Sequence, residues 1–105
     1  MSNMVVISTT AVPDHVRGAL TRWMTEPAPG FYVGTVSAKV RDRLWDAVAA
    51  SVGEGAAVCV HPADNEQRYL IRTAGDRRRQ VVDFDGLQLI LFRGEERGEN
   101  GIAPL

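Results

Sequence analysis

The chain has 105 residues, 45% of them hydrophobic, and its twelve basic and thirteen acidic side chains give a formal net charge of −1. This length suits one compact domain and excludes a second, and the balanced charge excludes nucleic-acid binding through a global positive field. A single cysteine excludes an internal disulfide, and no apolar run approaches the roughly 20 residues of a membrane span. With no secretory leader expected, a soluble cytoplasmic protein is predicted.

A first strand is predicted over residues 4–8, where a continuous apolar run is rich in β-branched residues. Such runs are typical of a central strand that is buried on both faces of a sheet. The strand is expected to end in a polar cluster at Ser8, Thr9 and Thr10.

A first helix is predicted to follow, with Pro13 in its first turn, where the missing amide of proline costs nothing. Asp14 beside it complements the positive end of the helix dipole. Two prolines and a glycine within residues 27–30 end this helix and lead to a short strand over residues 31–33. The expected buried face of the helix consists of Val16, Leu20, Trp23 and Met24.

A second, amphipathic helix is predicted after this aromatic strand. Ser37 is a good N-cap, because its hydroxyl can accept a hydrogen bond from a free amide of the first turn. Free amides at a helix N-terminus can hold a phosphate when a cation such as Lys39 lies beside them. The spacing alone favours a plain capped helix.

The second helix has one apolar and one charged side. Arg41 and Asp42 are expected on the solvent side, and Gly53 stands where a C-terminal glycine is expected. The apolar stripe, which should face the core, consists of Val40, Leu44, Trp45, Val48, Ala49 and Val52.

The rest of the chain is predicted to be mainly extended. Residues 57–73 have the pattern of a hairpin, and two more extended segments over residues 81–84 and 87–92 are split by Asp85-Gly86, a dipeptide that favours a tight turn. From residue 94 the sequence is polar and glycine-rich, so this tail should be loosely held unless a partner orders it.

This order of elements predicts an α+β fold, with two helices on one face of a mainly antiparallel sheet. The other face of the sheet then needs a cover. A second copy of the chain is the simplest cover for a domain of this size, so a homodimer that associates through the sheet side is expected.

Side chains suited to metal binding or nucleophilic attack are sparse. His15 and His61 belong to different elements without a second ligand nearby, which favours structural roles over metal ligation, and Cys59 in an alternating strand has the pattern of a buried thiol. Asp83 and Asp85 could present paired carboxylates to a cation, although turn chemistry explains Asp85 equally well. The GTVSAK segment lacks the glycine that precedes the lysine in a phosphate loop.

Basic side chains form the better cluster. Arg77, Arg78 and Arg79 lie in one loop, and Arg17 and Lys39 each lie in the first turn or so of a helix. If both helix N-termini lie near that loop, the set could contact a run of phosphates without reading bases. The alternative is a solvated arginine loop, which composition alone favours.

Four segments occur in the same order as in CRISPR-associated protein 2 of type I-E systems, which the chain resembles over residues 4 to about 93. They are VVIS followed by VP, the RGAL helix ending in Trp, FYVGTVSAKVRDRLWDAV, and RRRQVVDFDGLQLILF. The most specific part is YVGTVSAKVR, followed by DRRRQVVDFDGL. The resemblance implies a ferredoxin-like domain over residues 1–93 and a tail over residues 94–105 that, with the last strand, docks the CRISPR integrase.

The same resemblance implies a role in antiviral spacer acquisition. A homodimer with its two sheets packed together would bridge two integrase dimers and hold duplex DNA across its surface. The family's DNA-backbone contacts map onto Arg17, Lys39, Arg78 and Arg79, and Arg77 belongs to the same loop. His15 stands where related proteins have another arginine, so this contact is expected to be weaker or pH-dependent.

The chain departs from the family at its catalytic position. Similar proteins were grouped as metal-dependent endoribonucleases because an acidic residue at the end of the first strand could bind magnesium in the dimer interface. Here that place has only hydroxyl groups, which are poor lone ligands for a hard cation, and this departure argues against intrinsic nuclease activity. Two alternatives remain: a magnesium-dependent endonuclease (endoribonuclease or DNase) at the dimer interface, with Asp14 or Asp83 as candidate Mg²⁺ ligands, and a regulatory module that binds a small ligand.

Overall fold

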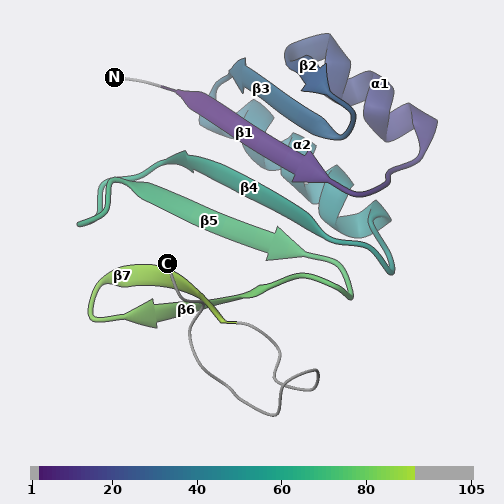
Figure 1. Ribbon diagram of the computed structural model, residues 1–105. Coiled ribbons are helices and arrows are strands. Elements are labelled where there is room, and N and C mark those ends of the chain that lie inside the picture. Colours follow the sequence, from purple (N-terminus) through teal and green to yellow (C-terminus); the bar gives the residue numbers. More distant parts are fainter. Residues whose placement is uncertain (1–2, 92–105) are drawn as a thin grey trace.

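Over residues 3–91, which are the residues described, the computed structural model contains a five-stranded sheet, two helices and a separate hairpin (Figure 1). The predicted tail over residues 94–105, its integrase docking and the last residue of the extended segment at 87–92 lie outside the described residues. The elements are β1 (Met4–Thr9), α1 (Asp14–Trp23), β2 (Thr25–Ala28), β3 (Phe31–Thr35), α2 (Ala38–Ser51), β4 (Ala57–Pro62), β5 (Tyr69–Ala74), β6 (Gln80–Phe84) and β7 (Leu87–Leu91).

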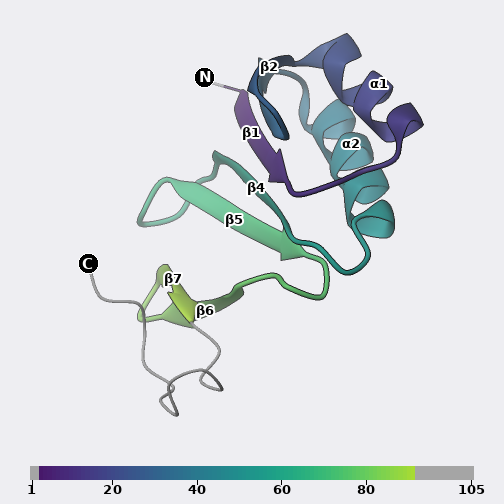
Figure 2. The ribbon, with the colours of Figure 1, turned by 45° about the vertical axis from the view of Figure 1, so that its right-hand side comes forward.

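The five-stranded sheet has the order β2-β3-β1-β4-β5, and all neighbouring strands are antiparallel. Both helices lie against the same face of this sheet (Figure 2), which confirms the predicted α+β plan. A helix after β1 and another after β3, with β1 in the centre, is compatible with a ferredoxin-like fold, to which β5 adds a strand beside β4. Neither α1 nor α2, the helices of the described part, is long and apolar enough to cross a membrane.

Strand β1 is central, as predicted, but only one of its faces is buried. Val5, Ile7 and Thr9 point to the helix side and are at most 7% exposed, whereas Val6 and Ser8 alternate with them and are half-buried. The expectation of burial on both faces is therefore wrong for a single chain, because both helices cover the same side of the sheet.

The core lies between the sheet and the helices. Ile7, Tyr32 and Cys59 of the sheet are at most 1% exposed, and the apolar sides of α1 and α2 pack over them. The predicted stripe of α2 is confirmed, with Val40 and Ala49 at its partly buried margin. Trp23, however, is 50% exposed, because α1 ends at this residue and the chain is already extended at the next one.

The capping residues predicted for the two ends of α2 are confirmed. The Ser37 hydroxyl accepts a hydrogen bond from the Val40 amide at 3.2 Å, as expected of an N-cap. Gly53 follows the last turn with φ = +57°, a left-handed conformation that glycine adopts without steric cost.

Strand β2 was not predicted, because the prolines of residues 27–30 suggest a loop. It is an edge strand, where a proline without an amide is tolerated, and its pairing with β3 is irregular between Thr25 and Ala28.

Strands β6 and β7 form their own two-stranded sheet beside β5 (Figures 1 and 2). The predicted tight turn is confirmed, with φ = 58° at Asp85 and 86° at Gly86. The Gln88 side chain holds the hairpin on β5. Its Oε1 accepts from the Ile71 amide at 2.8 Å, and its Nε2 donates to the Ile71 carbonyl at 3.3 Å.

Candidate nucleic-acid interface

The arginine loop between β5 and β6 is fixed by its backbone. The amides of Asp76 and Arg77 donate to the carbonyls of Gly53 and Gly55, each at 2.9 Å. Gly75 has φ = +97°, and a Cβ there would come within 2.3 Å of the Gly55 carbonyl oxygen. The loop therefore approaches the α2–β4 connection so closely that it needs glycine.

The arginines of this loop are exposed but partly anchored. Arg78 donates to the Gly75 carbonyl twice, from its backbone amide at 3.1 Å and from Nη1 at 2.9 Å. Arg78 and Arg79 also line a cavity of about 320 Å³ that reaches Ser8, Thr9 and Thr10. The fold thus brings two arginines of the basic loop to the end of β1.

Arg17 approaches the end of β1 from α1. Its Nη2 donates to Oε2 of Glu26 at 3.2 Å, and its side chain remains 54% exposed. A second cavity, of about 270 Å³, is lined by Arg17 and Glu26 together with Thr9 and Thr10. Arg17 and the loop arginines therefore flank the same stretch of chain.

The Thr9–Thr10 stretch between the cavities is firmly held. The Thr9 amide donates to the Gly30 carbonyl at 2.8 Å. The Thr10 amide donates to the Ala56 carbonyl, and the Ala56 amide donates back to the Thr10 hydroxyl, both at 3.0 Å. We call Arg17, Arg78 and Arg79, placed around this stretch, the β1-end cluster.

Lys39 lies at the other end of β1. It is exposed on the first turn of α2, and the pairing of Met4 with Thr35 places the start of α2 beside the start of β1. At about 3.3 Å per residue, the start and end of β1 are roughly 17 Å apart. The arginine loop therefore lies near the N-terminus of α1 but not near that of α2. The predicted single cluster, which needs both helix N-termini at the loop, is not formed.

The two remaining basic candidates flank the cluster in sequence. His15 is exposed in the first turn of α1, and Arg77 is exposed in the basic loop. Sequence reasoning missed Glu26, which pairs with Arg17 and has no motif to mark it.

The candidate Mg²⁺ ligands do not form a site within one chain. Asp14 starts α1 and Asp83 lies on β6, both exposed, and residues 3–91 contain no group of three or more His, Cys, Asp or Glu side chains that could hold a metal ion. The end of β1 offers hydroxyl and guanidinium groups, whereas Mg²⁺ prefers charged oxygens. The residues present do not fit the magnesium site that the resemblance implies.

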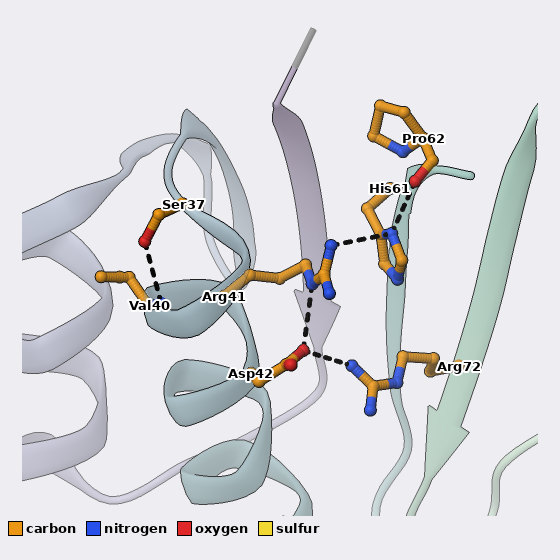
Figure 3. A network of polar contacts seen from close by, with 7 residues as sticks. All are labelled: Ser37, Val40, Arg41, Asp42, His61, Pro62 and Arg72. Carbon is orange, nitrogen blue, oxygen red and sulfur yellow. Dashed lines mark hydrogen bonds and ion pairs between the residues drawn. The ribbon is translucent and has the colours of Figure 1, made fainter. Parts of the chain in front are cut away.

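A polar network on the helix side of the sheet was also missed (Figure 3). Asp42 Oδ1 accepts from Arg41 Nε at 3.0 Å and from Arg72 Nη1 at 2.9 Å, and these two bonds, Arg41 first, lower the pKa of Asp42. Arg41 Nη1 also lies 3.2 Å from Nδ1 of His61, and the same Nδ1 lies 2.9 Å from the Pro62 carbonyl. One Nδ1 atom can accept from the arginine or donate to the carbonyl, but not both at once.

This network links α2 to β4 and β5, so Arg41 and Asp42 are half-buried and not on the solvent side as predicted. His61 is 7% exposed, consistent with the structural role expected for it. The expected buried thiol is confirmed: Cys59 is fully buried, and burial raises its pKa to about 11.

Comparison with known families identifies a match over most of the chain. The model of the family described as CRISPR-associated protein (Cas_Cas2CT1978) matches residues 4–89. The matched range runs from β1 into β7 and includes every residue of the β1-end cluster as well as Lys39.

Proposed function

The chain belongs to the Cas2 family of CRISPR-associated proteins, and on this premise we propose that it is a homodimeric, structural DNA-binding subunit of the spacer-acquisition complex. In this role it bridges integrase dimers and holds duplex DNA without reading its sequence. The observation that carries the proposal is the β1-end cluster, in which arginines from α1 and from the β5–β6 loop flank one rigid stretch of chain.

The chemistry of the cluster suits phosphate groups. A guanidinium presents a planar fork of donors that can bond two phosphate oxygens at once. Contacts to phosphates fix the position of a protein on the duplex but carry no sequence information. Lys39, at the other end of β1, adds a cation for a phosphate farther along the same duplex.

An open apolar sheet face supports the homodimer. Paired residues of an antiparallel sheet lie on the same face, so the register places several apolar side chains together opposite the helices. Exposed apolar surface of this kind marks an interaction site, and a second copy of the chain would cover it. The side chains are Met4, Val6, Phe31, Val33, Val58, Val60, Tyr69 and Ile71.

The donor set at the end of β1 does not favour the magnesium-dependent endonuclease, so the proposal is confined to a structural role. Cleavage of RNA or DNA that a chelator inhibits, and that is lost on mutation of Asp14 or Asp83, would support the endonuclease alternative.

Replacing Arg78 and Arg79 together with alanine tests the proposal. Removal of one arginine–phosphate interaction should reduce the steepness of the dependence of log K on log salt concentration by about 0.9. We therefore expect weaker duplex binding at low salt and a salt slope shallower by about two for each protomer that contacts the duplex. Fluorescence anisotropy with a labelled duplex at several salt concentrations measures both quantities.

The matched control is the Arg22→Ala, Arg43→Ala double variant, which removes the same charge from exposed positions on α1 and α2. It should keep the salt slope of the unmodified protein. Equal affinities and slopes for the two double variants would refute the DNA-binding role of the loop. Co-purification of the full chain with a CRISPR integrase, with and without residues 94–105, tests the bridging role.

A further inference from the structure

Glu26 lies beside Arg17 of the β1-end cluster, and its carboxylate accepts several hydrogen bonds. Its Oε2 accepts from the Gly30 amide at 3.0 Å and from Arg17 Nη2 at 3.2 Å, and the Tyr32 hydroxyl also hydrogen-bonds to this carboxylate. The Glu26 side chain is only 16% exposed, whereas that of Arg17 is 54% exposed. The acid is thus the more enclosed partner of the pair and the arginine the more exposed one.

The donors that fix Glu26 belong to rigid backbone. Tyr32 is 1% exposed in β3. Gly30 has φ = +78°, and a Cβ there would come within 2.3 Å of the Thr9 carbonyl oxygen. The turn between β2 and β3 is therefore locked to the end of β1, and it holds the carboxylate in place beside Thr9 and Thr10.

The groups around Glu26 favour its deprotonated, negatively charged form. The hydrogen bond from the Gly30 amide lowers the pKa of the carboxyl most, and Tyr32 and Arg17 lower it further against the opposing effect of burial. Burial raises the pKa of Tyr32, so its hydroxyl keeps its proton and can donate. At neutral pH the site holds a carboxylate and a guanidinium with opposite full charges.

The pairing leaves most of the guanidinium available. An arginine side chain has five N–H donors, and the bond to Glu26 uses a donor of Nη2. A long side chain that is already held in place loses less conformational freedom when it binds a ligand, and such preorganisation increases affinity.

We propose that Glu26 is a positioning residue that orients the Arg17 guanidinium toward the phosphate groups of duplex DNA, an inference that rests on the proposed function. The sign of its effect separates this role from a simple charge effect. An acidic side chain near DNA repels phosphates, so removal of its charge alone would strengthen binding, whereas loss of a positioning partner weakens it.

A double-mutant cycle with Glu26→Gln and Arg17→Ala tests the inference. The amide of glutamine can still accept from Gly30 and Tyr32 but gives up the charge that holds Arg17. We expect Glu26→Gln to weaken duplex binding about threefold or more, in the range of coupling between contacting residues, although it makes the protein more basic. In the Arg17→Ala background the same substitution should leave affinity unchanged or slightly increase it.

Tyr32→Phe is a second variant, which removes one of the donors to the carboxylate and keeps the buried ring. It should weaken binding less than Glu26→Gln does, and again only when Arg17 is present. Thermal unfolding of each variant confirms that it is folded at the assay temperature.

Two results would overturn the inference: unchanged or tighter binding by Glu26→Gln, or equal weakening with and without Arg17, which indicates a general structural effect. If Arg17→Ala weakens binding while Glu26→Gln does not, only the positioning role fails. If neither Arg17→Ala nor the loss of Arg78 and Arg79 affects binding, the proposed function itself fails.

Discussion

Cys59 lies in β4 on the helix side of the sheet, where it is fully buried. Burial raises the pKa of its thiol to about 11, although Arg72 and Arg41 nearby lower it. Because a raised pKa keeps a thiol protonated below that pH, the reactive thiolate is scarce at neutral pH, and no reagent reaches it in the folded chain.

We therefore expect Cys59 to react with a thiol-specific reagent only after unfolding. At neutral pH the native protein should react far more slowly than glutathione, and one thiol per chain should appear in denaturant. Ellman's reagent, with and without guanidinium chloride, measures this difference. Rapid reaction of the native protein would show that β4 opens readily.

At the residue scale, local signals were predictable and long-range partners were not. Ser37 and Gly53 could be recognised because the residues that cap a helix are close in sequence to the helix end that they cap. Glu26 could not, because its partners Arg17, Gly30 and Tyr32 meet only when α1, the β2–β3 turn and β3 come together. For the same reason, the helical spacing of apolar residues in α2 wrongly placed Arg41 and Asp42 on the solvent side.

At the scale of elements, the Gln88 side chain attaches the hairpin of β6 and β7 to β5. Gln88 satisfies both backbone groups of Ile71, which lie at the edge of the main sheet because β5 is the last strand of its order. The backbone amide of Gln88 also donates to the Gln67 side chain at 2.6 Å. The hairpin is thus held on β5 by side-chain amides and not by backbone hydrogen bonds between strands.

Gln88→Ala should loosen the hairpin. Loss of two hydrogen bonds to a half-buried backbone is expected to destabilise the protein by about 1–3 kcal/mol and to speed exchange of the Ile71 amide proton. Hydrogen exchange followed by NMR measures this amide directly. Gln80→Ala, at an exposed position on β6, is the matched control, and equal exchange in both variants would contradict the attachment.

Elements were predictable in type but less so in pairing. Helices and strands with clear periodicity were found within one or two residues of their predicted ends, whereas β2 was missed because its prolines resemble a loop. Nothing in residues 80–91 shows whether they continue the main sheet or form a separate one, because hydrogen bonding between strands depends on contacts far apart in sequence.

At the scale of the whole molecule, the helix layer covers one side of the sheet and leaves the other open (Figure 2). Val60 lies near the middle of that open side, opposite Val6 on the neighbouring strand. A charge placed there would be buried without a partner in a face-to-face dimer, at a high cost in free energy.

We therefore expect the protein to be a dimer and Val60→Asp to be monomeric. Light scattering after gel filtration should give about twice 11.5 kDa for the unmodified chain and 11.5 kDa for the variant. Ala38→Asp, which adds the same charge at the exposed start of α2, should remain dimeric. A monomeric unmodified chain at every concentration would contradict the expected homodimer.

The location of Lys39 has a consequence for covalent chemistry. It is the only lysine of the chain, and its side chain is exposed at the start of α2. Acetylation removes the charge of a lysine but does not modify a guanidinium. A single acyl group on this side chain therefore neutralises the cation at one end of β1 and leaves the three arginines at the other end fully charged, so the charge of the Lys39 end can be removed without changing that of the arginine end.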